Sequence, residues 1–227
     1  MKNLFDKYKI DVTDEQLNLF EEYYKLLVFY NDKFNITAIT ERQEVYIKHF
    51  VDSLLFVNKL KSGKYLDVGS GGGFPAIPIA IVRSDINYTL LEATNKKCEF
   101  LREVATRLNL PNVKVINGRA EELGLKSEYR EKFDCVTARA VARLNTLAEY
   151  SMPFVKVGGQ FISYKGDVDK ELEEGKNAVK TLGGVIEEVE KIEFFQAKRS
   201  GVFIKKVSKT DEKYPRSNGK IKKLPLK

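Results

Sequence analysis

The chain of 227 residues is long enough to form one ordinary domain with a buried core, and its 43% hydrophobic content is normal for a soluble globular protein. It contains no run of roughly 18 apolar residues and no signal-peptide core, and Cys98 and Cys135 have no metal-ligand spacing. We therefore expect a cytoplasmic protein with no membrane span and no metal. The net charge of +7, from 39 basic and 32 acidic residues, is informative only where it is concentrated.

Residues 1–60 have the pattern of helices. Thr13 followed by Gln16 is a capping-box signature, which marks a helix start. Apolar residues then recur at helical spacing: Leu17, Phe20, Tyr24, Leu27 and Val28. A second helix is expected over residues 44–60. We predict an N-terminal helical extension that ends near residue 60.

From residue 61 to 207 the pattern is that of an α/β domain. Five strand-like runs are separated by helical stretches: "YLDVG", "YTLLE", "VKVIN", "FDCVTAR" and "GQFISYK". Such alternation is typical of a parallel sheet covered by helices on both faces. Two further runs, residues 183–195 and 201–207, are joined by the link "QAKRS" and predict an antiparallel pair at the sheet edge. We expect a Rossmann-like sheet of seven strands.

The last segment, residues 208–227, is a basic tail. Residues 205–227 contain nine basic and two acidic side chains, so the whole net charge of +7 lies there and the preceding residues are balanced. A segment of this kind is attracted to a polyanion such as RNA. The alternative is a solvated, partly disordered tail.

A glycine loop follows the first expected strand, in "KYLDVGSGGGFPAIPIAI" (64–81). Ligands of doubly wound sheets bind beside the first strand-to-helix turn. The pattern is a strand acid, Asp67, followed by alternating glycines at Gly69, Gly71 and Gly73. Glycines there provide positive φ and let the backbone approach a ligand closely.

The loop is not a standard nucleotide motif. A dinucleotide fingerprint from Gly69 needs glycine where Phe74 stands, a start at Gly71 leaves the loop two residues longer, and no Walker Gly-Lys-Ser/Thr follows. Glu92 ends the next strand, 23 residues after Gly69, where a carboxylate accepts hydrogen bonds from ribose hydroxyls. NAD and S-adenosylmethionine both fit that carboxylate.

Motifs between residues 34 and 166 resemble those of a known family. They are "KHFVDSL", "DVGSGGGFPAIPIAI", "LLEATNKKCEFL", "GRAEEL", "FDCVTARAVARL" and "YKG". With the expected fold, they look like class I S-adenosylmethionine-dependent methyltransferases and, more narrowly, the RsmG (glucose-inhibited division protein B) family. The resemblance implies methylation of N7 of a guanine in the 530 loop of 16S rRNA, at position 527. Two departures are Ala76, where the family usually has glycine, and Ile221, where the tail often has proline.

The resemblance also implies residue roles. It assigns cofactor binding to Asp67, Gly69, Gly71, Phe74, Glu92, Ala120, Glu121 and Arg139. Gly69 and Phe74 are expected at the methionine end, Glu92 at the ribose, and Ala120 with Glu121 at the adenine. Arg139, the expected catalytic residue, would contact guanine O6 or a flanking phosphate; its alternative is a structural ion pair.

Substrate contacts are expected from a wider set. The candidates are His49, Lys96, Lys97, Arg119, Arg143, Lys165 and Arg216, with a plain solvated surface as the alternative for the lysines. His49 precedes Asp52 and Ser53 at helical spacing, so their contacts are expected to be local, and no nucleophile elbow marks a hydrolase. For His49 two roles stay open: closing or orienting the site, and a structural hydrogen bond.

The implied chemistry fits the residue types. Methyl transfer is an in-line displacement, and N7 of guanine has a lone pair and no proton, so positioning suffices and no general base is needed. No amine-methylating Asn-Pro-Pro-Tyr motif follows the fourth strand, where "TARAVARL" stands instead, and Cys135 lies within that strand as a core thiol. The target base must be unstacked, which favours a single-stranded loop.

Other function classes remain alternatives. A nicotinamide-dependent reductase is disfavoured by Phe74 and by the lack of a separate catalytic domain after Gly166. A non-catalytic binding module would hold cofactor or RNA without turnover. A methyltransferase for small molecules is disfavoured by the basic tail. For an enzyme acting on 16S rRNA or the small ribosomal subunit, we expect a monomer.

Overall fold

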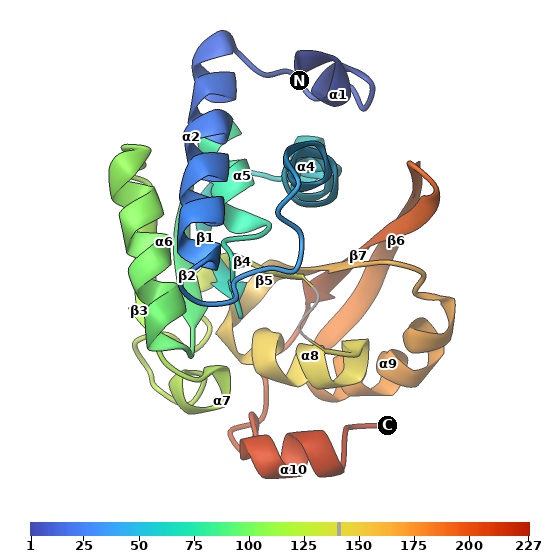
Figure 1. The fold of residues 1–227 in the computed structure, drawn as a ribbon. Coiled ribbons are helices and arrows are strands. Elements are labelled where there is room, and N and C mark those ends of the chain that lie inside the picture. The colour runs from blue at the N-terminus through green and yellow to red at the C-terminus, as the bar shows by residue number, and fades with distance from the viewer. Residues whose placement is uncertain (140–141) are drawn as a thin grey trace. The chain divides into compact units, whose positions relative to one another are not determined.

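The computed structural model describes residues 1–139 and 142–227 (Figure 1). Among them, no helix combines the length and the apolar character that crossing a membrane requires. Backbone contacts divide the chain into two compact units. The first comprises residues 1–62 and 70–117, and the second comprises residues 63–69 and 118–227. The division follows contacts, whereas the three segments expected from the sequence follow composition.

The first unit begins with helices. They are α1 (Lys2–Asp6), α2 (Asp14–Asn31), α3 (Arg42–Val45), a π-helix (Tyr46–Val51), α4 (Asp52–Leu54) and a 3₁₀ helix (Val57–Lys59). The capping box is confirmed: the Thr13 hydroxyl accepts from the Gln16 N–H at 3.2 Å, and the Gln16 side chain accepts from the Thr13 N–H at 2.9 Å.

The expected helix over residues 44–60 differs from the structure. The helical segment begins at Arg42, widens into the π-helix and ends at Leu54. The Arg83 guanidinium donates to the carbonyls of Val57 and Leu60 at 3.2 and 3.0 Å. These carbonyls therefore have a partner outside the helix, and the chain turns there into a short 3₁₀ segment instead.

Aromatic packing holds these helices together. The Phe20 and Tyr23 rings of α2 each lie 5.1 Å from the ring of Phe50 in the π-helix, and all three side chains are buried. Such pairs add to the stabilisation from burial alone. The expected apolar stripe of α2 was partly wrong, because Tyr23 faces the core while Tyr24 is half-buried.

The rest of the first unit is a strand–helix–strand arrangement. Its elements are α5 (Ala76–Val82), β2 (Ile86–Glu92), α6 (Asn95–Arg107) and β3 (Val113–Asn117). β2 and β3 are parallel, with Glu92 opposite Asn117. The Asn117 amide donates to the Glu92 carbonyl at 3.1 Å, which fixes the ends of the two strands. Figure 1 shows α2 and α6 side by side.

The second unit holds the other strands. They are β1 (Gly63–Val68), β4 (Phe133–Arg139), β5 (Val155–Lys165), β6 (Gly184–Phe194) and β7 (Ala197–Lys206). β1, β4 and β5 are parallel, and β7 pairs antiparallel with both β5 and β6. The seven strands have the order β3-β2-β1-β4-β5-β7-β6. The expected α/β sheet with an antiparallel last pair is confirmed.

The link of the last hairpin is shorter than expected. β6 and β7 are joined only by Phe195 and Gln196, so most of "QAKRS" belongs to β7. Phe194 pairs with Ala197, and Phe195 has φ +44°. Ladder hydrogen bonds continue to the end of the ribbon because this left-handed residue closes a two-residue turn.

Four α-helices and a 3₁₀ helix complete the described part of the second unit: α7 (Ala120–Leu123), α8 (Leu144–Ser151), Met152–Phe154, α9 (Asp169–Thr181) and α10 (Asn218–Lys223). α8 packs against α9 and contacts β4 and β5, while α9 contacts β6 (Figure 1). α10 rests on α8, and Tyr214 and Ile221 are buried. The basic tail is therefore folded against this unit.

A buried lysine closes the end of β7. Lys206 is fully buried, and its ammonium donates to the carbonyls of Met152 and Leu182 at 2.9 and 3.2 Å and to the Thr210 hydroxyl. A carboxylate oxygen of Glu131 lies 3.6 Å away. All three ammonium protons have acceptors, which makes the burial of this group tolerable.

The pKa of Lys206 predicts a pH effect on stability. Burial lowers this pKa from 10.5 to about 8, against the attraction of Glu131 and with help from the charge of Arg130. Between these two values the unfolded chain binds a proton that the folded chain has lost, so the free energy of unfolding rises with pH. We expect the wild type to gain roughly 2 kcal/mol relative to Lys206→Met from pH 8 to 10.5. Urea unfolding of both proteins measures this, and parallel pH profiles would contradict it.

Candidate active site

The glycine loop has the backbone that its composition requires. Gly69 directly follows β1 with φ +72°, and Gly71 and Gly73 follow at +56° and +91°. A Cβ on Gly73 would lie 2.6 Å from the Tyr23 hydroxyl and 2.7 Å from Ile77. Side chains are thus excluded by conformation at three positions, and at Gly73 by space as well.

A single carboxylate holds the loop in the first unit. One oxygen of Glu92 accepts the Gly71 N–H at 2.9 Å, and the other accepts the Thr94 N–H at 2.7 Å. Glu92 is only 7% exposed. An ionised carboxylate has about four acceptor positions, so each oxygen keeps one for a further donor. A pair of ribose hydroxyls is a ligand that these two oxygens can bind.

An aromatic stack supports the same loop from its other side. The Phe74 ring lies 4.4 Å from the His49 imidazole with 16° between the planes, and the Tyr23 ring is 5.6 Å from Phe74. The Tyr23 hydroxyl donates to the Gly72 carbonyl. The sequence analysis did not predict a role for Tyr23. A polar hydroxyl within an apolar helix face was the feature that could have indicated a buried hydrogen bond.

The contact of His49 with Ser53 is local, as their spacing suggested, but the imidazole also reaches residues outside its helix. Its Nε2 lies 2.9 Å from the Thr37 hydroxyl and its Nδ1 lies 3.1 Å from the Lys48 carbonyl. The Ser53 hydroxyl donates to the backbone carbonyl of His49 at 2.5 Å, so it engages the main chain and not the imidazole. The contacts with Thr37 and Phe74 place His49 beside the glycine loop.

Two lysines predicted to contact RNA lie at the start of α6 in the first unit. Lys96 is exposed and Lys97 half-buried in the first turn of α6, three residues beyond the end of β2. That turn follows directly on Glu92 and Thr94.

In the second unit, Asp67 and Arg139 lie on neighbouring strands. Asp67 is buried and accepts from the Thr137 hydroxyl at 2.7 Å, which ties β1 to β4 just before Gly69. Arg139 is half-buried as the last residue of β4, opposite Tyr164 of β5. The motif "TARAVARL" continues through residues 140–141, which lie outside the described residues.

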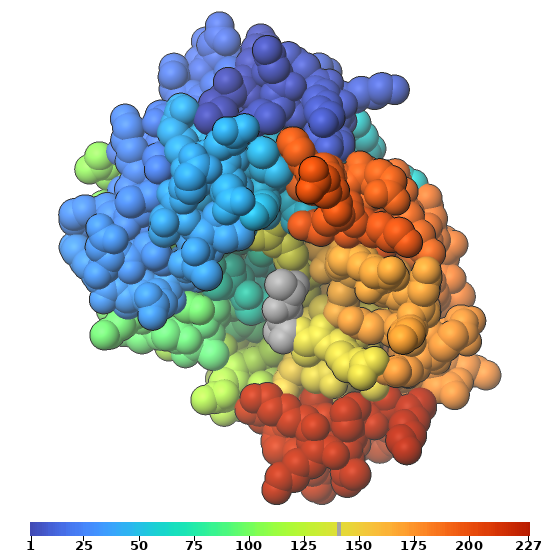
Figure 2. Space-filling model, turned by 45° about the vertical axis from the view of Figure 1, so that its right-hand side comes forward, coloured from blue at the N-terminus to red at the C-terminus, as the bar shows by residue number. Residues whose placement is uncertain are grey.

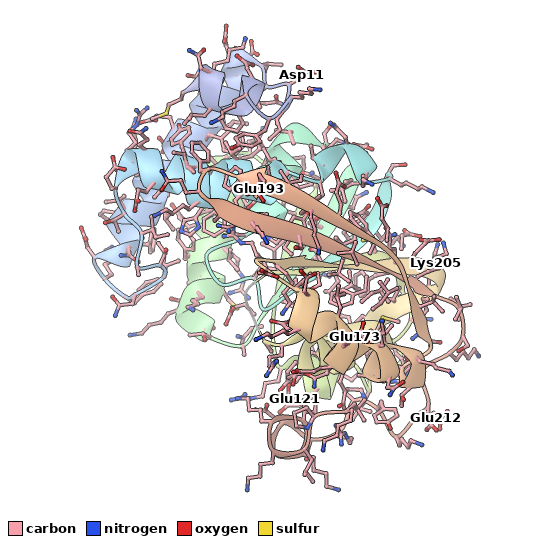
Figure 3. The ribbon with its side chains drawn as sticks, turned by 90° about the vertical axis from the view of Figure 1, so that its right-hand side faces the viewer. Asp11, Glu121, Glu173, Glu193, Lys205 and Glu212 are labelled. Atoms are coloured by element: carbon pink, nitrogen blue, oxygen red, sulfur yellow. The ribbon has the colours of Figure 1, made fainter. Side chains whose placement is uncertain are left out.

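Ala120 and Glu121 form the first turn of α7, after Arg119 at its N-cap. Beside this turn is an open hollow of about 490 Å³ in the second unit. It is lined by Arg119, Glu121, Glu122, Leu125, Pro215, Arg216, Ser217, Asn218 and Gly219. Figure 2 shows the C-terminal segment, in red, directly against the lime-coloured region of α7, and Figure 3 shows Glu121 beside that segment. The predicted adenine-binding residues are thus neighbours of the tail.

Three other basic candidates of the second unit are paired with acids. Lys165 has a side chain only 8% exposed and lies 2.8 Å from Glu171. The Arg216 guanidinium is held by Glu149 at 2.6 Å, while Arg143 pairs with Glu174 at the surface. Arg119 is exposed at the rim of the hollow. Arg119 and Arg143 are therefore the more accessible of these RNA-contact candidates.

The cysteines are core residues. Cys98 and Cys135 are buried, and burial raises the pKa of both thiols. This confirms the expectation that Cys135 is a buried core thiol, since a raised pKa keeps it protonated and poorly nucleophilic.

Sequence comparisons match most of this chain to one family. A sequence profile for GidB, described as rRNA small subunit methyltransferase G, matches residues 16–200. A "Ribosomal RNA small subunit methyltransferase G" from Lachnoclostridium phytofermentans is 47% identical over 225 residues, covering 96% of this chain and 92% of the relative. One from Desulforamulus reducens is 44% identical over 232 residues, covering 100% and 97%.

Solved structures show the same fold at low identity. A SAM-dependent O-methyltransferase from Thermotoga maritima has a TM-score of 0.55 at 14% identity, over 82% of this chain and 72% of that one. A ribosomal protein L11 methylase from Lactobacillus delbrueckii subsp. bulgaricus has a TM-score of 0.54 at 16% identity, over 71% and 79%. The class I methyltransferase fold expected from the sequence is confirmed.

The Tyr23 hydrogen bond predicts a stability cost. Tyr23→Phe leaves the Gly72 carbonyl without its buried donor, so we expect the free energy of unfolding to fall by about 1–3 kcal/mol. The matched control is Tyr24→Phe, which removes a 3.3 Å bond to an exposed carbonyl of Thr40 and should change it by less than about 0.5 kcal/mol. Urea unfolding compares the two, and equal losses would show that the loop does not depend on Tyr23.

Proposed function

The chain belongs to the GidB family of rRNA small subunit methyltransferases G, and from this premise we propose that it methylates N7 of a guanine in the 530 loop of 16S rRNA, at position 527 by family resemblance. Its cofactor is S-adenosylmethionine. The observation that carries the proposal is the positive-φ glycine loop held by the Glu92 carboxylate, in a chain that matches the family over residues 16–200.

The residues present fit this cofactor. Bound S-adenosylmethionine supplies an electrophilic methyl group on a sulfonium. Glu92 would accept the ribose hydroxyls with the acceptor positions that Gly71 and Thr94 leave open. By the family motifs, Ala120 and Glu121 would take the adenine.

The methionine end follows the same assignment. Gly69, Gly71 and Phe74 would line it, and the backbone approach there depends on the absence of Cβ atoms. Asp67 would support the loop through its bond to Thr137, since it fixes β1 two residues before Gly69.

The protein's contribution to chemistry would be positioning. N7 attacks with its own lone pair, so no residue has to remove a proton, and alignment of the two reactants supplies most of the rate. Arg139 would contact guanine O6 or a flanking phosphate, for which a guanidinium fork is suited. His49 would hold Phe74 in place through its stacked ring.

The substrate would be a single-stranded region of 16S rRNA, free or within the small subunit. α10 buries Ile221 and exposes Lys220, Lys222 and Lys223, which gives the C-terminal segment a cationic outer face. Phosphates are the natural partners of such a surface. We propose a monomer acting in the cytoplasm, where this RNA is made.

The proposal is tested by transfer of a radiolabelled methyl group to small subunits that lack the modification. Borohydride–aniline cleavage then maps N7-methylguanine. We expect one cut, in the 530 loop. Label in another atom or another loop would overturn the assigned target, and cofactor binding without transfer to subunits or naked RNA would favour a binding module or a small-molecule substrate.

Glu92 should control cofactor affinity. Glu92→Gln removes the charge and turns one acceptor into an amide donor, which faces the N–H of Gly71 or Thr94. We expect the Kd of S-adenosylhomocysteine to rise by about 10- to 100-fold, the effect of losing hydrogen bonds to a charged group. The control is Glu99→Gln, an exposed acid on α6. Calorimetry measures both, and unchanged binding by Glu92→Gln would remove the ribose role.

The outer lysines of α10 should set the salt dependence of RNA binding. Replacing Lys220, Lys222 and Lys223 with Gln should reduce the slope of log K against log salt by about 2, given about 0.7 for each single-strand phosphate contact. The control removes the same charge from α9, at the exposed Lys170, Lys176 and Lys180. Filter binding at several salt concentrations measures the slopes; equal slopes for both triple variants would contradict a contact by α10.

A further inference from the structure

An arginine pins the C-terminal segment to the end of α7. The Arg130 guanidinium donates to four backbone carbonyls: Gly124 at 2.9 Å, Tyr214 at 2.8 Å, Thr210 at 2.7 Å and Asp211 at 3.1 Å. One carbonyl belongs to the C-cap of α7 and the other three to residues 210–214. A single charged group thus joins two segments more than 80 residues apart in the chain.

Gly124, whose carbonyl Arg130 binds, is part of the turn that carries Ala120 and Glu121. The Gly124 N–H donates to the Ala120 carbonyl at 2.9 Å, so Gly124 closes that turn. Pro215 packs directly on it: a Cβ on Gly124 would lie 3.1 Å from a Pro215 ring carbon. The C-terminal segment therefore contacts α7 through both a hydrogen-bond network and side-chain packing.

A second anchor holds the segment just beyond. Glu149 of α8 is fully buried and accepts the Arg216 N–H at 2.9 Å, its Nε at 2.8 Å and its Nη2 at 2.6 Å. The Tyr150 hydroxyl donates to the Asn218 side chain at 2.7 Å. Glu121 lines the same hollow as Arg216 and Asn218, so the α7 turn and this anchor are neighbours.

We propose that residues 208–217 form a strap that positions the α7 turn for the cofactor's adenine, and that Arg130 is the positioning residue that fastens it. This rests on the proposed function, in which Ala120 and Glu121 bind adenine. α7 is only four residues long and cannot be rigid by itself, because short helices are marginal without tertiary contacts. A fixed turn loses less entropy when the ligand binds.

The strap separates two roles within the basic tail. The strap itself acts on cofactor affinity through α7, while the lysines of α10 stay exposed and available to RNA. Deleting residues 208–227 removes both roles at once. Single substitutions at Arg130 change only the attachment of the strap.

The test uses the full chain with Arg130→Gln, Arg130→Lys and the control Lys176→Ala, which removes an exposed ion pair on α9. We expect the Kd of S-adenosylhomocysteine, measured by calorimetry without RNA, to rise about tenfold in Arg130→Gln, as for one lost charge-assisted hydrogen bond. Arg130→Lys should give an intermediate value because an ammonium keeps part of the donor set. The KM for RNA should stay within about twofold, a split that general destabilisation would not produce.

Hydrogen exchange gives the second readout. Amides of residues 120–124 should exchange faster in Arg130→Gln while those of β1 and β4 keep the wild-type rate. Wild-type cofactor affinity in a folded Arg130→Gln overturns the strap, as does an equal loss for cofactor and RNA. If Arg130→Gln does not fold, Arg130→Lys decides the question. The strap is overturned if residues 120–124 of Arg130→Lys exchange faster than in the wild type while the Kd of S-adenosylhomocysteine is unchanged. Failure of the wild type itself to bind S-adenosylhomocysteine refutes the proposed function instead.

Discussion

The two hydrogen bonds from the Glu92 carboxylate to the backbone N–H groups of Gly71 and Thr94 are the constraint on which the first unit depends. The bond to Gly71 ties the end of β2 to the glycine loop, and the bond to Thr94 closes the turn that leads into α6. The loop can adopt this path only because its glycines accept positive φ. One buried acid thus sets the loop conformation while keeping acceptor positions for a ligand.

The N-terminal helices of this unit contact that loop directly. α2 supplies the Tyr23 hydroxyl to the Gly72 carbonyl, and the π-helix supplies the imidazole of His49 that stacks on Phe74. π-helical turns are rare and often occur at functional sites. The N-terminal helices are therefore a support for the glycine loop as well as an apolar core.

In the second unit, too, single charged side chains each hold several partners. Glu149 and Arg130 are each satisfied by several partners in the C-terminal segment, so a chain end rich in lysine folds back without burying an unpaired charge. Lys220, Lys222 and Lys223 of α10 stay exposed. A basic segment can both anchor itself and present a cationic surface when some of its residues are buried against the fold and others are exposed.

The strands were predictable from sequence and much of their support was not. The runs over 113–117 and 133–139 match β3 and β4, because β-branched residues recur in both and favour strands even in β3, where no residue is fully buried. The end of the second helix, the short link of the last hairpin and the inward-facing Tyr23 were missed. The helix end and Tyr23 depend on partners far along the chain, such as Arg83 for the carbonyls of Val57 and Leu60, that no local pattern reveals. The hairpin link is short because Phe195 adopts a left-handed conformation, which is unusual for phenylalanine.

The site follows the same division. The run of glycines predicted the positive-φ loop, since glycine adopts such a backbone at little cost. The ion pair of Arg216 with Glu149 could not be foreseen, because a buried acid on α8 is indistinguishable in sequence from a solvated one. Among the predicted RNA contacts, Lys165 and Arg216 therefore have structural partners that the sequence did not indicate.

The most direct measurement of the central claim is a crystal structure of this chain soaked with S-adenosylhomocysteine. The account predicts both ribose hydroxyls within hydrogen-bond distance of the Glu92 carboxylate, with the Gly71 and Thr94 N–H bonds retained. A ribose bound elsewhere, or a Glu92 carboxylate that leaves Gly71 to reach the ligand, would contradict it.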